Sequence, residues 1–345
     1  MGNFGKAVAA LSVPAFLLIS APLQPRPAGA KVLKMDLACT LPLGTAIEKM
    51  SYKFSDLVKE KTGGEVLVTV YPAGQLYKDK DMVEVIPSGA LSMGICNMDF
   101  WTGRDAALGL ITGNTFLFEG FDHLWRWVDD ETVRLAVDRA LNKLNSKLLA
   151  IFDYGPGSVI AKKELRTPQD WKGAKLRSYG ELCAVAIEAL GARPVVISAA
   201  EQYDALMKGI VDGCMTGPST FVARKLYEGA PYAMRTPLGY VEFLLVMNLD
   251  LFNGLPTGTQ GKILEAAREA ELWGRKVCAD EHVEWWRQLE GPLREKWGVK
   301  VYDLTPQEFK ALAALALPPE VERVKKLSPE LSKILLDRAE ALRSK

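Results

Sequence analysis

The sequence has few of the residues that most enzymes use for catalysis. Only His123 and His282 occur in the 345 residues. Each falls within a helical pattern, where a lone histidine is more often structural than catalytic. The chain has no Gly-x-Ser-x-Gly nucleophile elbow, no His-Glu-x-x-His zinc motif and no Walker loop. These absences disfavour the common serine hydrolases, zinc hydrolases and nucleotide-cleaving enzymes.

Cysteine is also scarce. The five cysteines lie at positions 39, 96, 183, 214 and 278, and none belongs to a Cys-x-x-Cys pair. An odd, scattered set argues against a disulfide framework, and a chain of this length can bury a sufficient core without one. We expect these residues to be small apolar core residues. A catalytic thiol at Cys96 or Cys214 is the alternative, although neither has a histidine nearby in the sequence.

The chain has little net charge and one notable apolar run, at its amino terminus. Lys6, the apolar residues 7–20 and Ala28-Gly29-Ala30 together match a secretory signal over residues 1–30, which predicts a periplasmic protein. A retained membrane anchor is the alternative, but the run is shorter than the ~20 residues a spanning helix needs, and it contains Pro14. Without residues 1–30, 41 basic residues face 42 acidic ones. We therefore expect a soluble mature chain with no stable membrane insertion and no nucleic-acid partner.

The rest of the chain alternates strands and helices in two similar units. In the first, strands are predicted at residues 32–38, 65–70 and 90–96, with helices at 45–61 and 79–86. In the second, strands are predicted at residues 174–177, 195–197 and 210–215, with helices at 181–190 and 199–209. Two such units predict an α/β protein with two lobes and a ligand cleft that closes by a hinge motion.

The connections between the units complete this prediction. Helices are expected at residues 122–149 and 259–294, the second broken near Gly291-Pro292, and short strands at 150–153 and 300–302. Tyr154-Gly-Pro-Gly-Ser158 is glycine-rich but has no lysine, so it predicts a turn where the chain crosses between lobes rather than a phosphate-binding loop. We assign residues 31–153 and 243–280 to lobe I, and residues 154–242 and 281–345 to lobe II.

Arg177 is the main candidate for ligand binding. It falls at the carboxyl end of the predicted strand 174–177, and Thr216 follows the strand 210–215; ligands of open α/β sheets bind at such ends. Arginine suits a carboxylate because its planar fork donates two parallel hydrogen bonds and stays charged. An ordinary surface arginine is the alternative. Nearby, Ser198 and Glu201 match the capping box that starts a helix.

Four blocks in this region resemble the solute-binding proteins of TRAP (tripartite ATP-independent periplasmic) transporters. The blocks are residues 167–177 (TPQDWKGAKLR), 189–195 (ALGARPV), 201–206 (EQYDAL) and 209–213 (GIVDG). The resemblance implies a two-lobed periplasmic binding protein fold with a long interlobe helix, here residues 259–294. It also implies that Arg177 forms a bidentate salt bridge to a substrate carboxylate, and that the protein delivers the substrate to TRAP membrane subunits.

Further candidate site residues follow from the same resemblance. Phe100 and Trp101 lie in a run similar to an aromatic segment of 2-oxo-acid-binding relatives, and Tyr240 and Phe243 lie where the chain returns between lobes. Core packing is the alternative for all four. Tyr154 and Ser158 lie where some relatives place a second arginine or a glutamine. Residues 154–158 contain no arginine, which disfavours a doubly charged ligand held by two guanidiniums.

The residues after the third strand of the second unit bear on the ligand and on a metal. Cys214-Met215-Thr216 replaces the common Gln-Glu-Asn of the family, which favours a ligand less polar than a sugar acid. Some relatives bind a metal through two glutamates, whereas here Met215 and only Glu242 lie near those positions. One carboxylate is a poor site for Na⁺ or Ca²⁺. We expect no metal, no other cofactor and no catalytic residue.

The sequence thus predicts an exported TRAP solute-binding protein for an organic acid, most simply a monocarboxylate with an apolar or aromatic body. A binding protein of another transporter class or of a chemoreceptor is the first alternative, and a periplasmic enzyme is the second.

Overall fold

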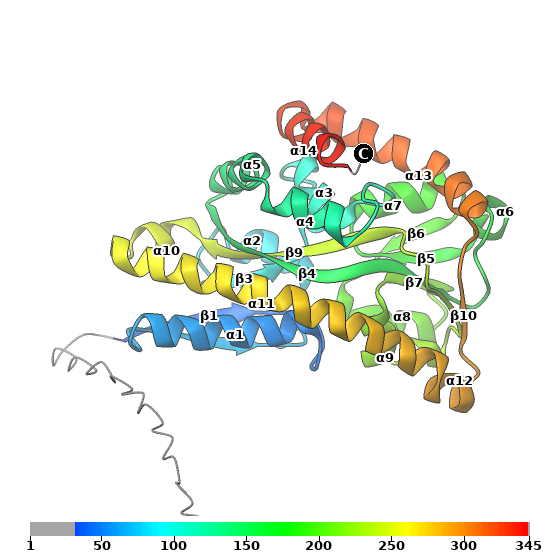
Figure 1. The fold of residues 1–345 in the computed structure, drawn as a ribbon, viewed down its shortest axis with the longest axis horizontal. Helices are drawn as coiled ribbons and strands as arrows, with labels where there is room; N and C mark the ends of the chain where they lie inside the picture. Colours follow the sequence, from blue (N-terminus) through cyan, green and yellow to red (C-terminus); the bar gives the residue numbers. More distant parts are fainter. Residues whose placement is uncertain (1–31, 344–345) are drawn as a thin grey trace, which may run out of the picture. The chain divides into compact units, whose positions relative to one another are not determined.

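The fold is a mixed α/β arrangement around a large twisted sheet (Figure 1). It is seen in a computed structural model that describes residues 32–343, so the predicted signal peptide lies outside the described residues. Within that range, the strands are β1 Leu33–Ala38, β2 Val66–Tyr71, β3 Met93–Cys96, β4 Ser146–Ala161, β5 Lys175–Ser178, β6 Arg193–Val196, β7 Gly213–Thr216, β8 Tyr232–Met234, β9 Gly239–Asn248 and β10 Lys300–Tyr302.

The sheet has two parallel parts joined by two long antiparallel strands. Its order is β2-β1-β3-β9-β4-β7-β5-β6, with β8 paired to β4 and β10 paired to β8. β1 is parallel to β2 and β3, and β5 is parallel to β6 and β7. We call residues 32–145 the N-terminal half and residues 162–238 the C-terminal half. β4 and β9 run between them, because β4 pairs first with β9 and then with β7.

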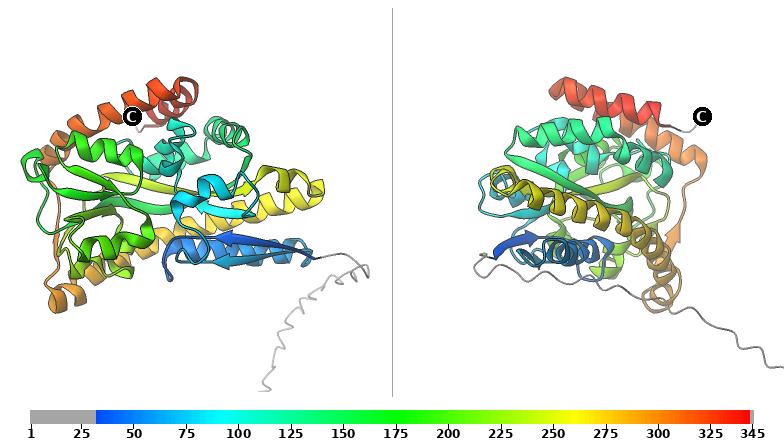
Figure 2. Two further views of the ribbon diagram at one scale, coloured as in Figure 1. Left: turned by 180° about the vertical axis from the view of Figure 1, so that it is seen from behind. Right: turned by 60° about the vertical axis from the view of Figure 1, so that its left-hand side comes forward.

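The helices cover both faces of the sheet. They are α1 Ala46–Lys61, α2 Met82–Val85, α3 Leu110–Gly113, α4 Phe121–Asp129, α5 Glu131–Asn142, α6 Pro168–Trp171, α7 Glu181–Ala189, α8 Gln202–Met207, α9 Pro218–Ala223, α10 Leu249–Asn253, α11 Thr257–Glu290, α12 Pro292–Trp297, α13 Pro306–Leu327 and α14 Pro329–Ala341. In Figures 1 and 2, α1 and α11 lie on one side of the β4–β9 pair, and α4, α5, α13 and α14 lie on the other.

The crossing strand β4 differs from its prediction. Residues 154–158 are not a turn, because β4 continues without interruption for 16 residues. Gly155, with a φ of 97°, lies where the pairing of β4 with β9 shifts by one residue. A bulge of this kind accommodates a left-handed glycine while the strand goes on. The glycine-rich segment therefore bends the strand and does not reverse it.

The predicted helix at residues 122–149 is wrong in two respects. It is divided into α4 and α5 at Asp130, whose carboxylate accepts a hydrogen bond from the Val133 backbone N–H (3.1 Å) and so caps α5. It also ends earlier than predicted, since Asn145 adopts a left-handed φ of 49° and β4 begins at the next residue. An N-cap and a left-handed residue thus override the apolar periodicity of this stretch.

The long helix α11 confirms the prediction for residues 259–294, including the break at Gly291. It spans 34 residues and packs along α1. Gly274 permits this close approach, because a Cβ atom at that position would lie 1.8 Å from the Met50 sulfur. A larger residue there would push the two helices apart.

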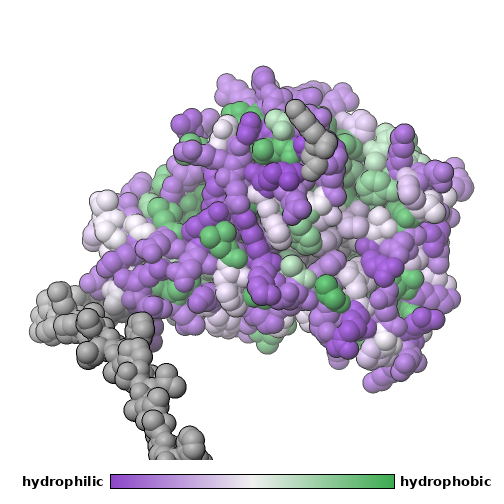
Figure 3. All heavy atoms as spheres, viewed as in Figure 1, coloured by the Kyte–Doolittle hydropathy of each residue, from purple (hydrophilic) through white to green (hydrophobic). Residues whose placement is uncertain are grey.

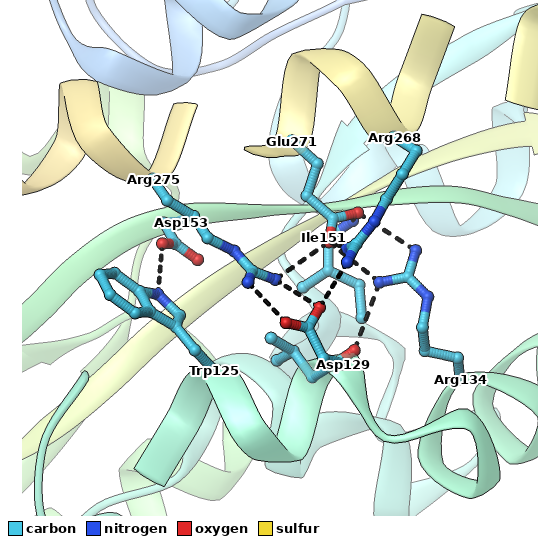
Figure 4. Close-up of polar contacts among 9 residues, drawn as sticks. Trp125, Asp129, Arg134, Ile151, Asp153, Arg268, Glu271 and Arg275 are labelled. Carbon is cyan, nitrogen blue, oxygen red and sulfur yellow. Dashed lines mark hydrogen bonds and ion pairs between the residues drawn. The ribbon is translucent and has the colours of Figure 1, made fainter. Parts of the chain in front are cut away.

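Glu271 attaches α11 to the crossing strand (Figure 4). Its side chain is fully buried, and its Oε2 accepts a hydrogen bond from the Ile151 backbone N–H (3.0 Å). Arg134 of α5 binds both carboxylate oxygens, at 3.0 and 3.1 Å. Arg268 and Arg275 of α11 pair with the same carboxylate. One buried charge thus joins α11, α5 and β4, and hydrogen bonds satisfy both of its oxygens.

Asp129 completes this polar cluster from the end of α4. It accepts hydrogen bonds from Arg268 (2.8 Å) and Arg275 (2.7 and 2.8 Å). Burial acts to raise the pKa of Asp129, but the hydrogen bonds from Arg275 and Arg268 lower that pKa to about 2. Asp129 therefore stays ionised at any physiological pH and keeps the two arginines oriented toward Glu271.

Apolar residues form the interior, and hydrophilic residues predominate on the visible surface (Figure 3). The five cysteines are free and buried, as predicted for small core residues. In the view of Figure 3, hydrophilic residues cover most of the visible face and apolar residues are scattered among them. Over residues 32–343, no helix combines the length and the apolar character of a membrane span.

Candidate functional site

A small cavity lies where the two halves meet the crossing strands. Both halves contribute side chains, and β4 and β9 supply the rest. The lining residues are Leu41, Asn97, Thr112, Tyr154, Arg177, Tyr179, Ala199, Gln202, Thr216, Thr220, Val241 and Phe243. The cavity thus lies at the carboxyl ends of β5 and β7, which is the edge of the sheet that the sequence predicted.

Arg177 projects into this cavity from β5 with its guanidinium fixed by two carbonyl groups. Its Nε donates to the Ile197 carbonyl oxygen just after β6 (2.8 Å), and its Nη1 donates to the Met215 carbonyl oxygen in β7 (2.9 Å). The ring of Tyr179 lies 5.8 Å from the guanidinium carbon. Because β6 and β7 flank β5, the strand pairing itself sets the direction of this side chain.

The charge of Arg177 has no carboxylate partner in residues 32–343. The side chain is only 2% exposed, and its two hydrogen bonds to protein go to neutral carbonyl groups. Burial lowers the pKa of Arg177 from its ordinary value, since a low-dielectric interior penalises the charged form. A buried cation is costly without an anion. The guanidinium thus has up to three of its five N–H groups left to donate.

A cluster of hydroxyl groups provides further donors. The Tyr154 hydroxyl accepts a hydrogen bond from the Gly217 backbone N–H (2.9 Å) and also contacts the Thr216 and Thr220 hydroxyls (2.9 and 2.8 Å). A phenol oxygen accepts two hydrogen bonds and donates one. Gly217 takes one acceptor position, so one threonine donates to Tyr154 and the other accepts from it. At least one threonine hydroxyl hydrogen remains for a ligand oxygen.

The remaining walls are apolar. Phe243 packs on Tyr154 with ring centroids 5.7 Å apart, and Leu41 and Val241 line the same space. No aspartate or glutamate is among the residues that line the cavity within the described chain. The site thus combines one fixed positive charge, a few hydroxyl groups and apolar surface, a composition typical of small-molecule sites.

The structure brings together only some of the predicted site residues. Arg177, Thr216, Tyr154 and Phe243 line the cavity. The other four make contacts within the protein: Trp101 is fully buried in a core cluster against which Phe100 packs, Ser158 donates to the Thr236 carbonyl oxygen (2.9 Å), and the Tyr240 ring lies edge-on to Phe121. These packing contacts and the Ser158 hydrogen bond account for the positions of the four side chains.

Several lining residues were not predicted from the sequence. Thr220 could have been found, because it lies in the first turn of α9, which begins just after β7 at the same edge of the sheet. Asn97 follows β3 and Thr112 lies in α3, both in the N-terminal half, and their side chains donate to the Tyr179 and Glu242 backbone oxygens. Only the fold brings them to the cavity, and no local pattern indicates it.

Asp99 joins the two halves beside the cavity. Its carboxylate, on the N-terminal half, accepts hydrogen bonds from the Leu182 and Cys183 backbone N–H groups at the start of α7 (2.7 and 2.9 Å). Burial raises the pKa of Asp99 to about 7, against the hydrogen bonds from Cys183 and Leu182 that lower it. Glycines surround the carboxylate: a Cβ atom at Gly180 would lie 2.3 Å from it, and one at Gly113 would lie 2.8 Å from it.

Asp79 makes a second contact of this kind and overturns the predicted capping box. The Ser198 hydroxyl does not cap its own helix but donates to Asp79 of the N-terminal half (3.1 Å), which also accepts from the Ala199 backbone N–H (2.9 Å). Glu201 pairs with Lys78 instead (2.7 Å). A charged acceptor from the other half is a stronger partner than a serine hydroxyl, and so it takes the capping position.

The two positions considered for a metal have different surroundings. Met215 lies in β7, and its carbonyl oxygen is used by Arg177. Glu242 is fully buried in β9 opposite Asp153 of β4. Burial and the nearby Asp153 raise the pKa of Glu242 well above its usual value. Within residues 32–343, no group of three or more His, Cys, Asp or Glu side chains is arranged to hold a metal ion.

Comparison with known proteins places this chain in a family. The family model described as "Bacterial extracellular solute-binding protein, family 7" (DctP) matches residues 37–323. Among curated proteins, the C4-dicarboxylate-binding periplasmic protein DctP of Rhodobacter capsulatus is 27% identical over 290 residues, covering 82% of this chain and 84% of that protein.

Solved structures share the fold. A TRAP periplasmic solute-binding protein of Shewanella oneidensis with bound succinate has a TM-score of 0.83 and 21% identity, covering 91% of this chain and all of that one. The Bordetella pertussis solute receptor DctP6, which binds pyroglutamic acid, has a TM-score of 0.82 and 22% identity, covering 89% and 99%. The likeness confirms the predicted two-lobed binding-protein fold with its long helix, and the family match confirms the resemblance seen in the sequence. The chain belongs to bacterial extracellular solute-binding protein family 7.

Proposed function

We propose that this protein is the periplasmic solute-binding subunit of a TRAP transporter and that it captures a small organic acid in the cavity around Arg177. The acid's carboxylate takes the place of the missing counter-ion. The subunit then delivers the acid to the membrane subunits of the transporter. The observation that carries this proposal is the buried guanidinium of Arg177, which is fixed by two carbonyl oxygens and has no protein carboxylate as a partner.

The relatives support an organic acid as the class of ligand. The R. capsulatus protein is named for C4-dicarboxylates, and the structural relatives hold succinate or pyroglutamate. In this chain the cavity is small and has one arginine and several apolar walls. A compact monocarboxylate therefore suits it better than a sugar acid with many hydroxyl groups, because each unpaired ligand hydroxyl would lose its hydrogen bonds to water.

The two-lobe division remains part of the proposal. Residues 31–153 with 243–280 would form lobe I, and residues 154–242 with 281–345 would form lobe II. The pairing of β4 first with β9 and then with β7 supports a crossing in this region, and Arg177 would bind the acid as the lobes close over it. Export to the periplasm rests on the signal pattern in residues 1–30 and on the family.

Binding without turnover is the expected outcome. Burial raises the pKa of the Cys214 thiol to about 12, so this cysteine near the site stays protonated and is a poor nucleophile. Burial also lowers the pKa of His282 to about 4, and that residue lies outside the cavity. The cavity itself offers hydrogen-bond donors and a cation, which are groups that hold an anion.

The test begins with a thermal-shift screen of the purified mature chain against organic acids, since a ligand at 100 times its dissociation constant adds about 2.7 kcal/mol of stability. For each acid that stabilises the protein, calorimetry then compares Arg177→Ala, Arg177→Lys and the control Arg193→Ala. Arg193 begins β6 in the same sheet but is exposed. Losing one partner of a buried charge pair costs about 2 to 5 kcal/mol, or roughly 30-fold to several thousand-fold in affinity.

Arg177→Lys should also weaken binding, because an ammonium cannot reproduce the fork. Arg193→Ala should leave affinity unchanged. Unaltered affinity of Arg177→Ala for every acid that binds the wild type would disprove the role of this residue. Failure of all acids to bind would disprove the proposed ligand class.

A further inference from the structure

Among the side chains that line the cavity within residues 32–343, Gln202 has a buried hydrogen-bond acceptor without a partner. It is the first residue of α8, only 1% exposed, and it lines the cavity. Its Nε2 donates to the Ala199 carbonyl oxygen (3.1 Å). Its Oε1 is buried and has no hydrogen-bond partner among residues 32–343. A buried acceptor left unpaired costs about 1 to 3 kcal/mol, so the site favours whatever satisfies it.

The orientation of this amide is fixed by its surroundings. Turning it by half a rotation would bring Oε1 against the Ala199 carbonyl oxygen, and two acceptors repel each other. This hydrogen bond therefore assigns Oε1 as the free acceptor of the amide. It lies on the same segment as Ile197, whose carbonyl oxygen holds Arg177. Arg177 and Gln202 thus line the same cavity.

A carboxylate alone cannot satisfy both groups. Its oxygens only accept hydrogen bonds, so they match Arg177 and the threonine hydroxyls but not Gln202 Oε1. A second ligand group must donate. An ammonium is a poor choice, because no aspartate or glutamate lines the cavity within the described chain and Arg177 already carries a positive charge. A neutral donor, either a hydroxyl or an amide N–H, fits this electrostatic environment.

We infer that Gln202 sets the specificity of the site by selecting acids that carry a neutral O–H or N–H donor close to the carboxylate, such as small hydroxy acids or lactam acids. The inference rests on the proposed function, since it assumes that Arg177 binds the carboxylate. Gln202 then accepts the hydrogen bond of the donor, while Leu41, Val241 and Phe243 surround the apolar part of the ligand.

Matched pairs of acids test this inference by calorimetry. One pair is 2-hydroxy-3-methylbutanoate and 3-methylbutanoate, and the other is pyroglutamate and N-methylpyroglutamate. In the wild type, the acid with the donor should bind at least about 10-fold more tightly in at least one pair, the lower range for an unpaired buried group. In Gln202→Met, that preference should fall below about 3-fold because the donor-bearing acid loses its acceptor.

The control is Gln288→Met, the same substitution on α11, where the side chain donates a hydrogen bond to Glu284 of its own helix (3.1 Å). It should keep the wild-type preference. Equal affinity for both members of each pair in the wild type would overturn the inference, and so would a preference that survives in Gln202→Met. If Gln202→Met fails to fold, equal affinity of the wild type for both members of each pair still overturns the inference.

The proposed function is judged separately through Arg177→Ala. If that variant weakens both members of a pair equally and the wild type does not distinguish them, the carboxylate site stands and the role of Gln202 is wrong. If none of the four acids binds, the inference is overturned, and the broader acid screen decides the proposed function.

Discussion

Replacing Glu271 by glutamine tests how the long helix is held to the sheet. The substitution keeps the size of the side chain and an oxygen for the Ile151 N–H, but it removes the negative charge facing Arg134, Arg268 and Arg275. Glu271 is fully buried, so its charge is little screened by water. The substitution therefore isolates the electrostatic part of the contact.

The expected loss follows from what remains. Breaking a buried ion pair costs about 3 to 5 kcal/mol. Two features reduce the loss: the Arg134 and Arg268 side chains are 23% and 39% exposed, and Asp129 still pairs with Arg268 and Arg275. We therefore expect about 3 kcal/mol. At about 2 °C per kcal/mol for a chain of this size, the melting temperature should fall by roughly 6 °C.

The assay is denaturant and thermal unfolding followed by circular dichroism, with Glu265→Gln as the matched control. Glu265 lies on the same helix and pairs with Lys61 at 2.9 Å, but its side chain is 68% exposed. An exposed pair contributes only about 0 to 1 kcal/mol. A loss in Glu271→Gln no greater than that in Glu265→Gln would refute the reasoning, because it would show that the cluster tolerates a neutral centre.

Two further predictions concern Asp99. Gly180→Ala should destabilise the protein by about 1 to 3 kcal/mol, because the added Cβ would lie 2.3 Å from the Asp99 side chain; unfolding midpoints check this, and an unchanged midpoint would contradict the close contact. Burial raises the pKa of Asp99 from 3.8 to about 7, so the folded state keeps a proton that the unfolded state releases. This contribution to stability is fully present below pH 4 and is lost as the pH rises through 7, by up to roughly 4 kcal/mol, and Asp99→Asn should flatten that part of the profile. Parallel pH profiles of stability for the wild type and Asp99→Asn would count against it.

The sequence predicts best those elements that have local signals at their ends. The helix predicted at residues 181–190 is α7, which ends just before Gly191 with its left-handed φ of 85°, and Gly291-Pro292 breaks the long helix where predicted. Residues 154–158 carry equally strong turn residues, yet they continue a strand. Pairing with β9, which lies far away in the sequence, decides that outcome. A local sequence pattern carries no information about such a distant partner.

The candidate site also contains residues that a local sequence signal could place and residues that only the fold could place. Arg177 and Thr216 could be placed because strand ends on one edge of a parallel sheet converge. Phe100 and Trp101 could not be separated from core residues, since aromatic side chains look alike in either role. Gln202 gave no signal at all: its proposed role depends on the Ala199 carbonyl oxygen that fixes its amide, and on its position in the wall of the cavity.

The carboxylates that cap helices across the halves have a consequence for motion. Asp79 and Asp99 belong to one half, whereas the three backbone amides that they hold, at residues 182, 183 and 199, belong to the other. A slight separation would leave both carboxylates and all three amides too far apart to bond and too close together to be hydrated. Such intermediate spacings are therefore unfavourable, and opening should be a jump between two discrete positions instead of a continuous widening.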